Sequence, residues 1–103
     1  MSKRRYDEYK PFLRTLANGT RLAIIKCLQA GEKPVSRIVK ELRAPQPTVS
    51  YNLGILAECS FVSAKKVGKE RIYALNTKTI KPLLKLVDIH VHCYCKPKCL
   101  CGC

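Results

Sequence analysis

The spacing of apolar residues changes from helical to strand-like at Ser60, and this change restricts the fold more than any other feature of the chain. Residues 61–67 and 71–75 are rich in β-branched and aromatic side chains, and Gly68-Lys69 between them is a turn signal. Together they predict a β-hairpin. Helical spacing precedes the hairpin and resumes shortly after it. The expected fold class is therefore mainly α with a small β-hairpin (α+β).

Five helices are expected around this two-stranded hairpin, four before it and one after it. The third is a short helix after Pro34, and the fourth runs from Pro47 to about Glu58. Proline is favoured at a first helical position because its missing N–H would be unpaired there. A tight turn at 43–46 joins the two helices. A helix, a turn, a helix and a hairpin in this order predict a winged helix-turn-helix, whose 47–58 helix should enter the major groove of DNA.

Polar side chains at the start of the 47–58 helix and cations in the hairpin are the candidate DNA contacts. Short hydroxyl and amide side chains can hydrogen-bond base edges and phosphates, and cations in a wing suit phosphates or the minor groove. From the residues alone, two other interpretations stay open: helix capping for the hydroxyl and amide groups, and protection of an edge strand for the cations. The candidates are Gln46, Thr48, Ser50, Tyr51 and Asn52 in the helix, and Lys65, Lys66, Lys69 and Arg71 in the hairpin.

The charge of the chain favours a polyanionic partner. There are 20 Lys and Arg residues against 7 Asp and Glu, a formal net charge of +13, and the excess is spread along the whole length. Each phosphate that such a surface neutralises releases a counterion, which favours nucleic acid. An anionic membrane is the rival partner, but no stretch resembles a transmembrane helix or a signal peptide, so no membrane association and a cytoplasmic location are expected.

Three motifs in order resemble the ArsR/SmtB family of metal-responsive repressors. LANGTRLAII at 16–25 resembles the family's L-A-D-P-T-R-L-x-I-L, QPTVSYNL at 46–53 its recognition helix Q-S-x-V-S-x-H-L, and GKERIYAL at 68–75 its wing G-R-x-x-x-Y-x-L. The resemblance covers residues 12 to 92. It implies a homodimer, held through the first and last helices, on an imperfect palindrome of double-stranded DNA with recognition helices roughly 34 Å apart.

Two positions depart from the family pattern. Asn52 replaces the usual histidine of the recognition helix, so a base preference does not carry over. Ser60 stands where the family usually has a glycine after that helix, and strain is expected in the turn.

The last helix carries a long apolar stripe. A core as small as this one cannot absorb all of it, which favours a dimer interface over packing within the same domain. The stripe consists of Ile80, Leu83, Leu84, Val87 and Val91.

Cysteine is concentrated at the C-terminal end and divides the chain into a DNA-binding and dimerisation domain at 1–92 and a tail at 93–103. Five of the seven cysteines lie in the tail, in C-x-C pairs that let neighbouring thiolates converge on one ion. Thiolates favour soft or borderline ions, namely Cu(I), As(III), Cd(II), Zn(II) or Hg(II). The alternatives are a disordered thiol-rich tail and a structural zinc site. The expected ligands are Cys93, Cys95, Cys99, Cys101 and Cys103.

The family resemblance also bears on the metal site. The family's cysteine pair in the third helix is missing, because Pro34-Val35-Ser36-Arg37-Ile38 aligns with it. Asp88 and His90 match the first half of the family's D-x-H-x₁₀-H-x₂-E site, but Cys101 falls at the second histidine. The resemblance therefore favours thiolate chemistry, with a site that adds Asp88 and His90 to the tail cysteines kept open.

These features predict a repressor that releases its operator when a soft ion binds the tail. Two alternatives remain: a regulator whose tail thiols sense oxidation, and an architectural DNA-binding protein with a structural or storage metal tail. An enzyme is not expected, because the sequence has no Ser/His/Asp set and no glycine-rich phosphate loop.

Overall fold

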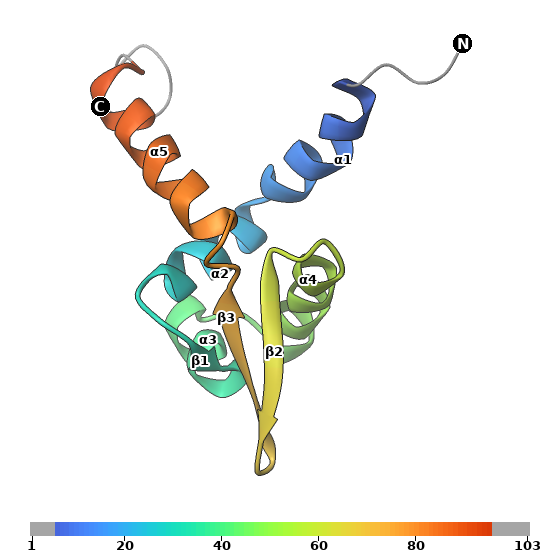
Figure 1. The fold of residues 1–103 in the computed structure, drawn as a ribbon. Coiled ribbons are helices and arrows are strands. Elements are labelled where there is room, and N and C mark those ends of the chain that lie inside the picture. The colour runs from blue at the N-terminus through green and yellow to red at the C-terminus, as the bar shows by residue number, and fades with distance from the viewer. Residues whose placement is uncertain (1–5, 96–103) are drawn as a thin grey trace.

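The computed structural model describes residues 6–95, and their elements confirm the winged helix-turn-helix. This part of the chain forms five helices and three strands. The hairpin projects from the helical body (Figure 1). In order the elements are α1 (Tyr6–Leu16), α2 (Gly19–Gln29), β1 (Lys33–Pro34), α3 (Val35–Leu42), α4 (Gln46–Glu58), β2 (Val62–Val67), β3 (Glu70–Leu75) and α5 (Ile80–Cys93).

The hairpin belongs to a three-stranded antiparallel sheet of order β1-β3-β2. Val62 pairs with Leu75 at the base of the hairpin and Val67 with Glu70 near its tip. The two-stranded wing expected from the sequence is thus extended by β1, where Lys33 pairs with Tyr73. A two-residue strand shows no apolar period, so pattern analysis had no signal for it. The consequence is that the root of the wing is hydrogen-bonded to the segment that leads into α3.

The hydrophobic core lies between the helix-turn-helix and the sheet. Val49, Leu53 and Leu56 of α4 are fully buried and pack with residues of α2, α3 and the sheet. This burial confirms that Val49 and Leu53 hold α4 on the domain. Phe61, at the start of the hairpin, is buried and stacks on Phe12 of α1 with ring centroids 5.1 Å apart. The side chains on the opposite face of α4, such as Thr48 and Tyr51, remain exposed to solvent.

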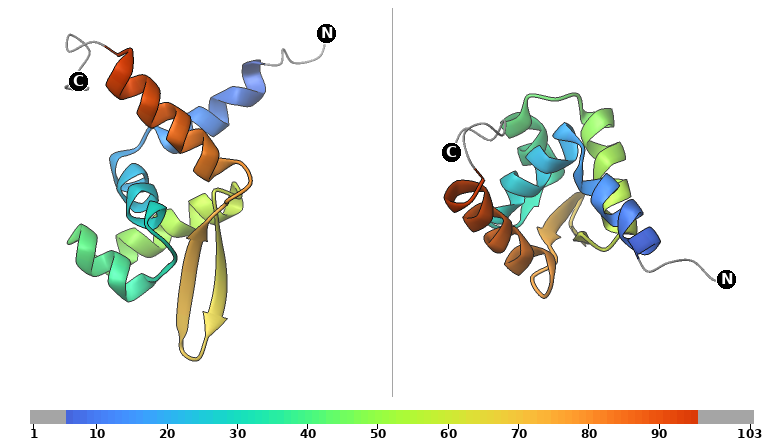
Figure 2. Two further views of the ribbon diagram at one scale, coloured as in Figure 1. Left: turned by 60° about the vertical axis from the view of Figure 1, so that its left-hand side comes forward. Right: turned by 90° about the horizontal axis from the view of Figure 1, so that it is seen from above.

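Helices α1 and α5 form two arms on the side of the body opposite the wing tip, and their free ends diverge (Figures 1 and 2). The stripe of α5 is divided: Ile80 and Leu84 are buried in the domain's own core, whereas Val87 is 42% exposed. Further apolar side chains are exposed on α5 and on α1, among them Ile89 at 53% and Leu13 at 56%. No helix within residues 6–95 is long and apolar enough to cross a membrane.

The turn after α4 contains the strain expected at Ser60. Its φ is 61°, in the left-handed region that glycine adopts without a steric penalty. The Ser60 carbonyl accepts a hydrogen bond from Asn76 Nδ2 at 3.0 Å, and this bond does not depend on the side chain at position 60.

Ser60→Gly is expected to stabilise the fold. Relief of the left-handed strain should raise the free energy of unfolding by about 0.5–1 kcal/mol, or the Tm by about 3–6 °C for a domain of this size. Thermal unfolding measures the shift. Ser63→Gly in β2 is the matched control and should lower the Tm, because Ser63 has no positive φ and glycine weakens a strand. Equal shifts for both variants would contradict strain at Ser60.

A polar cluster fixes β1 to the C-terminal end of α3. Lys33 Nζ lies 2.8 Å from Glu41 Oε1, Arg37 Nε donates to Glu41 Oε2 at 3.0 Å, and Cys27 Sγ donates to Glu41 Oε1 at 3.2 Å. The hydrogen bond from Lys33, followed by that from Cys27, lowers the pKa of Glu41 from 4.5 to about 2. Burial, together with the hydrogen bond to Glu41, raises the pKa of the Cys27 thiol. This Cys27 thiol is therefore expected to stay protonated near neutral pH.

The Glu41 cluster predicts an acid-sensitive contribution to stability. Because the pKa is lower in the folded state, the contribution is complete above pH 4.5 and is lost as the pH falls toward 2. The Tm difference between the wild type and Glu41→Gln should therefore be largest above pH 5 and shrink steadily below pH 4.5. Calorimetry across this range tests it, and a pH-independent difference would contradict the assignment.

Candidate nucleic-acid interface

The first turns of α4 present four of the five predicted polar contacts to solvent. Gln46, Thr48 and Ser50 are exposed, and Tyr51 is 69% exposed. The N-cap residue is Pro45, and no side chain caps the helix. The capping interpretation of these hydroxyl and amide groups is therefore not supported, and they are available to a partner.

Asn52, the fifth predicted DNA contact of this helix, differs from the other four. It is only 6% exposed and faces the domain. Its Oδ1 accepts a hydrogen bond from Arg21 Nη1 at 3.1 Å, and its Nδ2 donates to the Thr48 carbonyl at 2.8 Å. The prediction that Asn52 is presented to DNA is wrong for this structure, because both polar atoms of its amide have partners inside the protein.

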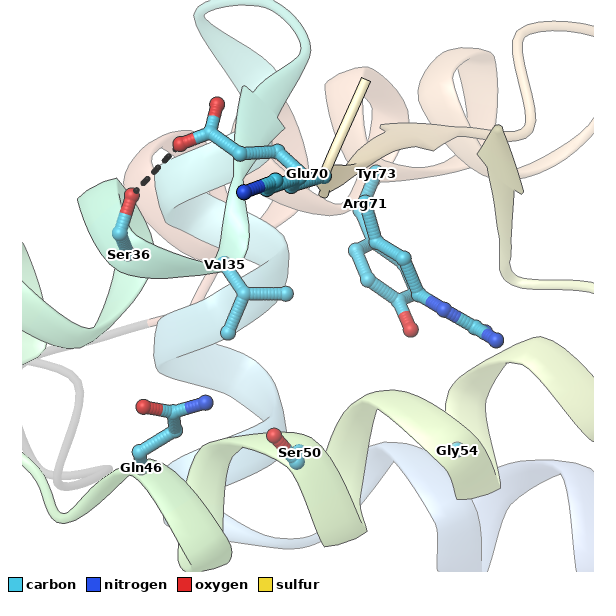
Figure 3. A pocket seen from close by; sticks show the side chains of 9 residues that line it. Val35, Ser36, Gln46, Ser50, Gly54, Glu70, Arg71 and Tyr73 are labelled. Atoms are coloured by element: carbon cyan, nitrogen blue, oxygen red, sulfur yellow. Dashed lines mark hydrogen bonds between the residues drawn. The ribbon is translucent and has the colours of Figure 1, made fainter. Parts of the chain in front are cut away.

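A groove of about 520 Å³ separates α4 from the wing (Figure 3). Gln46 and Ser50 line it from α4, and Lys69 and Arg71 line it from the β2–β3 turn and β3. The recognition helix and the wing therefore both contribute polar side chains to one groove. The other lining residues are Val35, Ser36, Gly54, Glu70 and Tyr73.

Two of these lining residues had no sequence signal. Ser36 Oγ donates to Glu70 Oε2 at 3.5 Å, a contact that joins the first turn of α3 to β3 (Figure 3). The two residues are 34 positions apart, and only the fold brings them together. Glu70 also places a negative charge beside the cations of the wing.

The predicted cations of the wing are all exposed, namely Lys65, Lys66, Lys69 and Arg71. Lys65 Nζ lies 3.4 Å from Glu32 Oε1, an exposed pair of the kind that contributes little to stability. β2 is an edge strand of the sheet, so protection of that edge by its lysines also fits the structure. Lys69 and Arg71 line the groove, and this position is what favours phosphate contacts by the wing.

The predicted metal ligands within the described residues do not form a cluster. Asp88 is paired with Lys26 at 3.2 Å, and the His90 ring stacks on Tyr94 at 5.6 Å. A site that adds Asp88 and His90 to the tail cysteines therefore stays a prediction. No group of three potential ligands lies within residues 6–95.

The tail begins at the end of α5. Cys93 is the last residue of α5 and is exposed, and Cys95 follows half-buried. The other predicted ligands, Cys99, Cys101 and Cys103, lie outside the described residues. The donor set fits a soft ion by its chemistry, because every cysteine offers a sulfur ligand.

Comparisons with known proteins agree with this fold. A helix-turn-helix domain family matches residues 16–62. An HTH-type transcriptional regulator of Methanocaldococcus jannaschii is 35% identical, over 82% of this chain and 96% of that protein. The arsenical resistance operon repressor of Staphylococcus aureus is 26% identical, over 88% of this chain and 91% of its own. The homodimeric winged helix-turn-helix DNA-binding domain of a Mycobacterium bovis protein, described as a possible ArsR-family regulator, superposes with a TM-score of 0.74 at 28% identity, over 86% of this chain and 85% of that one.

The order of the elements, the exposed polar turn of α4 beside a basic wing, and these relatives lead to one conclusion. This chain is a DNA-binding transcriptional repressor of the ArsR/SmtB type, and it belongs to that family of winged helix-turn-helix regulators.

Proposed function

We propose that two copies of this chain bind an imperfect palindrome in double-stranded DNA, repress the adjoining promoter, and release the DNA when a soft metal or metalloid ion binds the C-terminal thiolates. The observation that carries the DNA-binding part is the groove between α4 and the wing. Polar side chains of α4 and cations of the wing line this one groove, which suits base edges and phosphates respectively.

The pairing of two copies is supported by the arms. α1 and α5 expose apolar side chains that a monomer leaves in water, including Leu13, Leu86 and Ile89. The Mycobacterium bovis domain with the same fold is homodimeric. Two recognition helices related by a two-fold axis would match a palindrome.

The ion-sensing part is supported by the position of the thiols. They follow directly from α5, an arm of the proposed dimer, so ligation there can change how the two subunits pair. The Staphylococcus aureus relative is an arsenical resistance repressor. For a 100-fold loss of DNA affinity, the ion must favour the DNA-free state by about 2.7 kcal/mol.

Fluorescence anisotropy of the reduced, metal-free protein on its own upstream DNA tests the proposal. The complex is titrated in turn with Cu(I), As(III), Cd(II), Zn(II) and Hg(II). Release by one ion at a stoichiometric level supports the proposal and identifies the inducer. Release by an oxidant under strict chelation, reversed by a thiol reductant, would replace ion sensing by redox sensing. Binding that no treatment changes would remove the sensing part.

Substitutions should separate base-reading from phosphate-binding residues. Gln46→Ala or Ser50→Ala should cost about 1–3 kcal/mol of discrimination at one operator position and leave the salt dependence unchanged. Lys66→Ala or Lys69→Ala should weaken binding to all duplexes alike and lower the salt slope by about one unit each. Anisotropy against salt, on operator and scrambled duplexes, makes both measurements. An unchanged salt slope for the lysine variants would place the wing away from the phosphates.

A further inference from the structure

A partly buried chain of hydrogen bonds connects the end of arm α1 to the recognition helix. Arg21 of α2 is at its centre: Nε donates to the Thr15 carbonyl at 2.7 Å and Nη1 donates to Asn52 Oδ1 at 3.1 Å. Asn52 Nδ2 passes the connection on to the Thr48 carbonyl at 2.8 Å. The chain therefore runs from the last turn of α1, through α2, to the first turns of α4.

The α1 end and the centre of this hydrogen-bonded chain are both fixed. The Thr15 carbonyl is among the last four of α1, which have no partner within the helix, so the guanidinium of Arg21 supplies the missing donor. The Arg21 backbone N–H donates to Asn18 Oδ1, the N-cap of α2, at 3.0 Å. Arginine offers its donors in a rigid planar fork, so one guanidinium held at two points sets a distance and a direction between its partners.

The position of Asn52 on α4 gives this chain a connection to DNA recognition. Thr48, whose carbonyl ends the chain, has an exposed side chain on the DNA-facing turn. Asn52 lies one helical turn later and points into the body. A change in the Arg21–Asn52 contact would therefore rotate or shift the turn that carries Thr48 and Ser50, with no change in any exposed group.

We infer that Arg21 and Asn52 are a positioning pair, which holds the recognition helix at a fixed angle to the C-terminal end of α1. Asn52 acts on DNA binding through the placement of α4, and not by touching a base. The inference rests on the proposed function, in which α4 reads the operator and α1 is part of the dimer interface. A shift of α1 in that dimer would then reach α4 through the guanidinium of Arg21.

A double-mutant cycle tests the pair. Arg21→Lys keeps the charge but cannot hold both partners, and Asn52→Ala removes the acceptor. Each single variant should lose about tenfold in operator affinity, and the double variant should lose little more than either single one, because both break the same connection. The affinity for scrambled DNA and its salt slope should not change, since no phosphate contact is removed. Arg37→Lys on the exposed face of α3 is the matched control and should bind as the wild type does.

Three outcomes would overturn the inference. Losses that simply add in the double variant would show that the two residues act independently. A relaxed preference at one operator position in Asn52→Ala would make Asn52 a base-reading residue. A lower Tm with unchanged operator affinity of the folded protein would leave the pair a purely structural role.

A measurement without DNA keeps the inference separate from the proposed function. Amide hydrogen exchange across 48–52 should become faster in both single variants, while the buried amides of α2 at Ile24 and Ile25 should exchange as in the wild type. Unchanged exchange at 48–52 would overturn the positioning role even if operator binding is intact. A wild-type protein that binds no operator would overturn the proposed function, with the exchange result still deciding whether Arg21 and Asn52 position α4.

Discussion

Leu13→Glu or Ile89→Glu is expected to convert the proposed dimer into a monomer and to lower operator affinity at least about 100-fold, because the second recognition helix no longer binds as part of the same molecule. Both side chains are more than half exposed on the arms, Leu13 on α1 and Ile89 on α5. A buried, unpaired carboxylate in an apolar interface opposes association strongly. Sedimentation equilibrium measures the mass, and anisotropy on the full palindrome measures the affinity.

A half-site duplex provides the control for these arm variants. Each monomer still has an intact α4 and wing, so its affinity for a single half-site should equal that of a wild-type subunit. The thermal unfolding of the folded monomer should also retain one cooperative transition, since neither side chain is in the buried core. If the variants remain dimeric, or lose half-site binding as well, the arms are not the interface.

Serine in place of all five tail cysteines is expected to abolish the response to the ion while DNA binding is kept. The wild-type complex should lose about 100-fold in affinity at saturating ion, equivalent to about 2.7 kcal/mol of coupling, and the variant should lose none. The hydroxyl of serine is a poor ligand for a soft ion, whereas the thiolate of cysteine is a good one. Anisotropy with and without the inducing ion measures the difference.

Two cysteines outside the tail supply the matched control for the tail variant. Cys27 and Cys59 lie in α2 and at the C-cap of α4, and Cys27→Ser with Cys59→Ser should leave the ion response at the wild-type level. Asp88→Asn tests the alternative site that adds Asp88 and His90 to the tail cysteines, because it removes a carboxylate ligand and leaves every thiol in place. Full ion release in the tail variant would contradict the thiolate site.

The helical part of the fold could be predicted because its signals are local. Pro47 predicted the start of α4 to within one residue, since the helix begins at Gln46. Val49 and Leu53 recur at helical spacing, so the buried face of α4 also followed from neighbouring residues. Ser60 was predicted to be strained from the glycine usual at that position, and its φ of 61° confirms the strain. Each of these features depends on the backbone conformation and on residues close by in the sequence.

The features that could not be predicted depend on distant contacts. Asn52 has the polarity of a surface residue, and its Oδ1 is satisfied in the interior by Arg21, 31 positions earlier. β1 exists because Lys33 and Pro34 meet β3, although two residues carry no pattern of their own. Ile80 and Leu84 of α5 belong to the core, while residues later in the same stripe do not, and the sequence period is the same for both.

The divergence of α1 and α5 has a consequence for the dose response of the regulated promoter. In the proposed scheme, their exposed apolar faces are covered only when two copies pair. A newly made chain with no partner is therefore not yet a repressor. While most chains are unpaired, the number of dimers rises with the square of the protein concentration, so doubling the supply raises operator occupancy about fourfold. Repression would then switch on over a narrow range of expression, and unequal division of a few molecules between daughter cells would separate them into silent and active states.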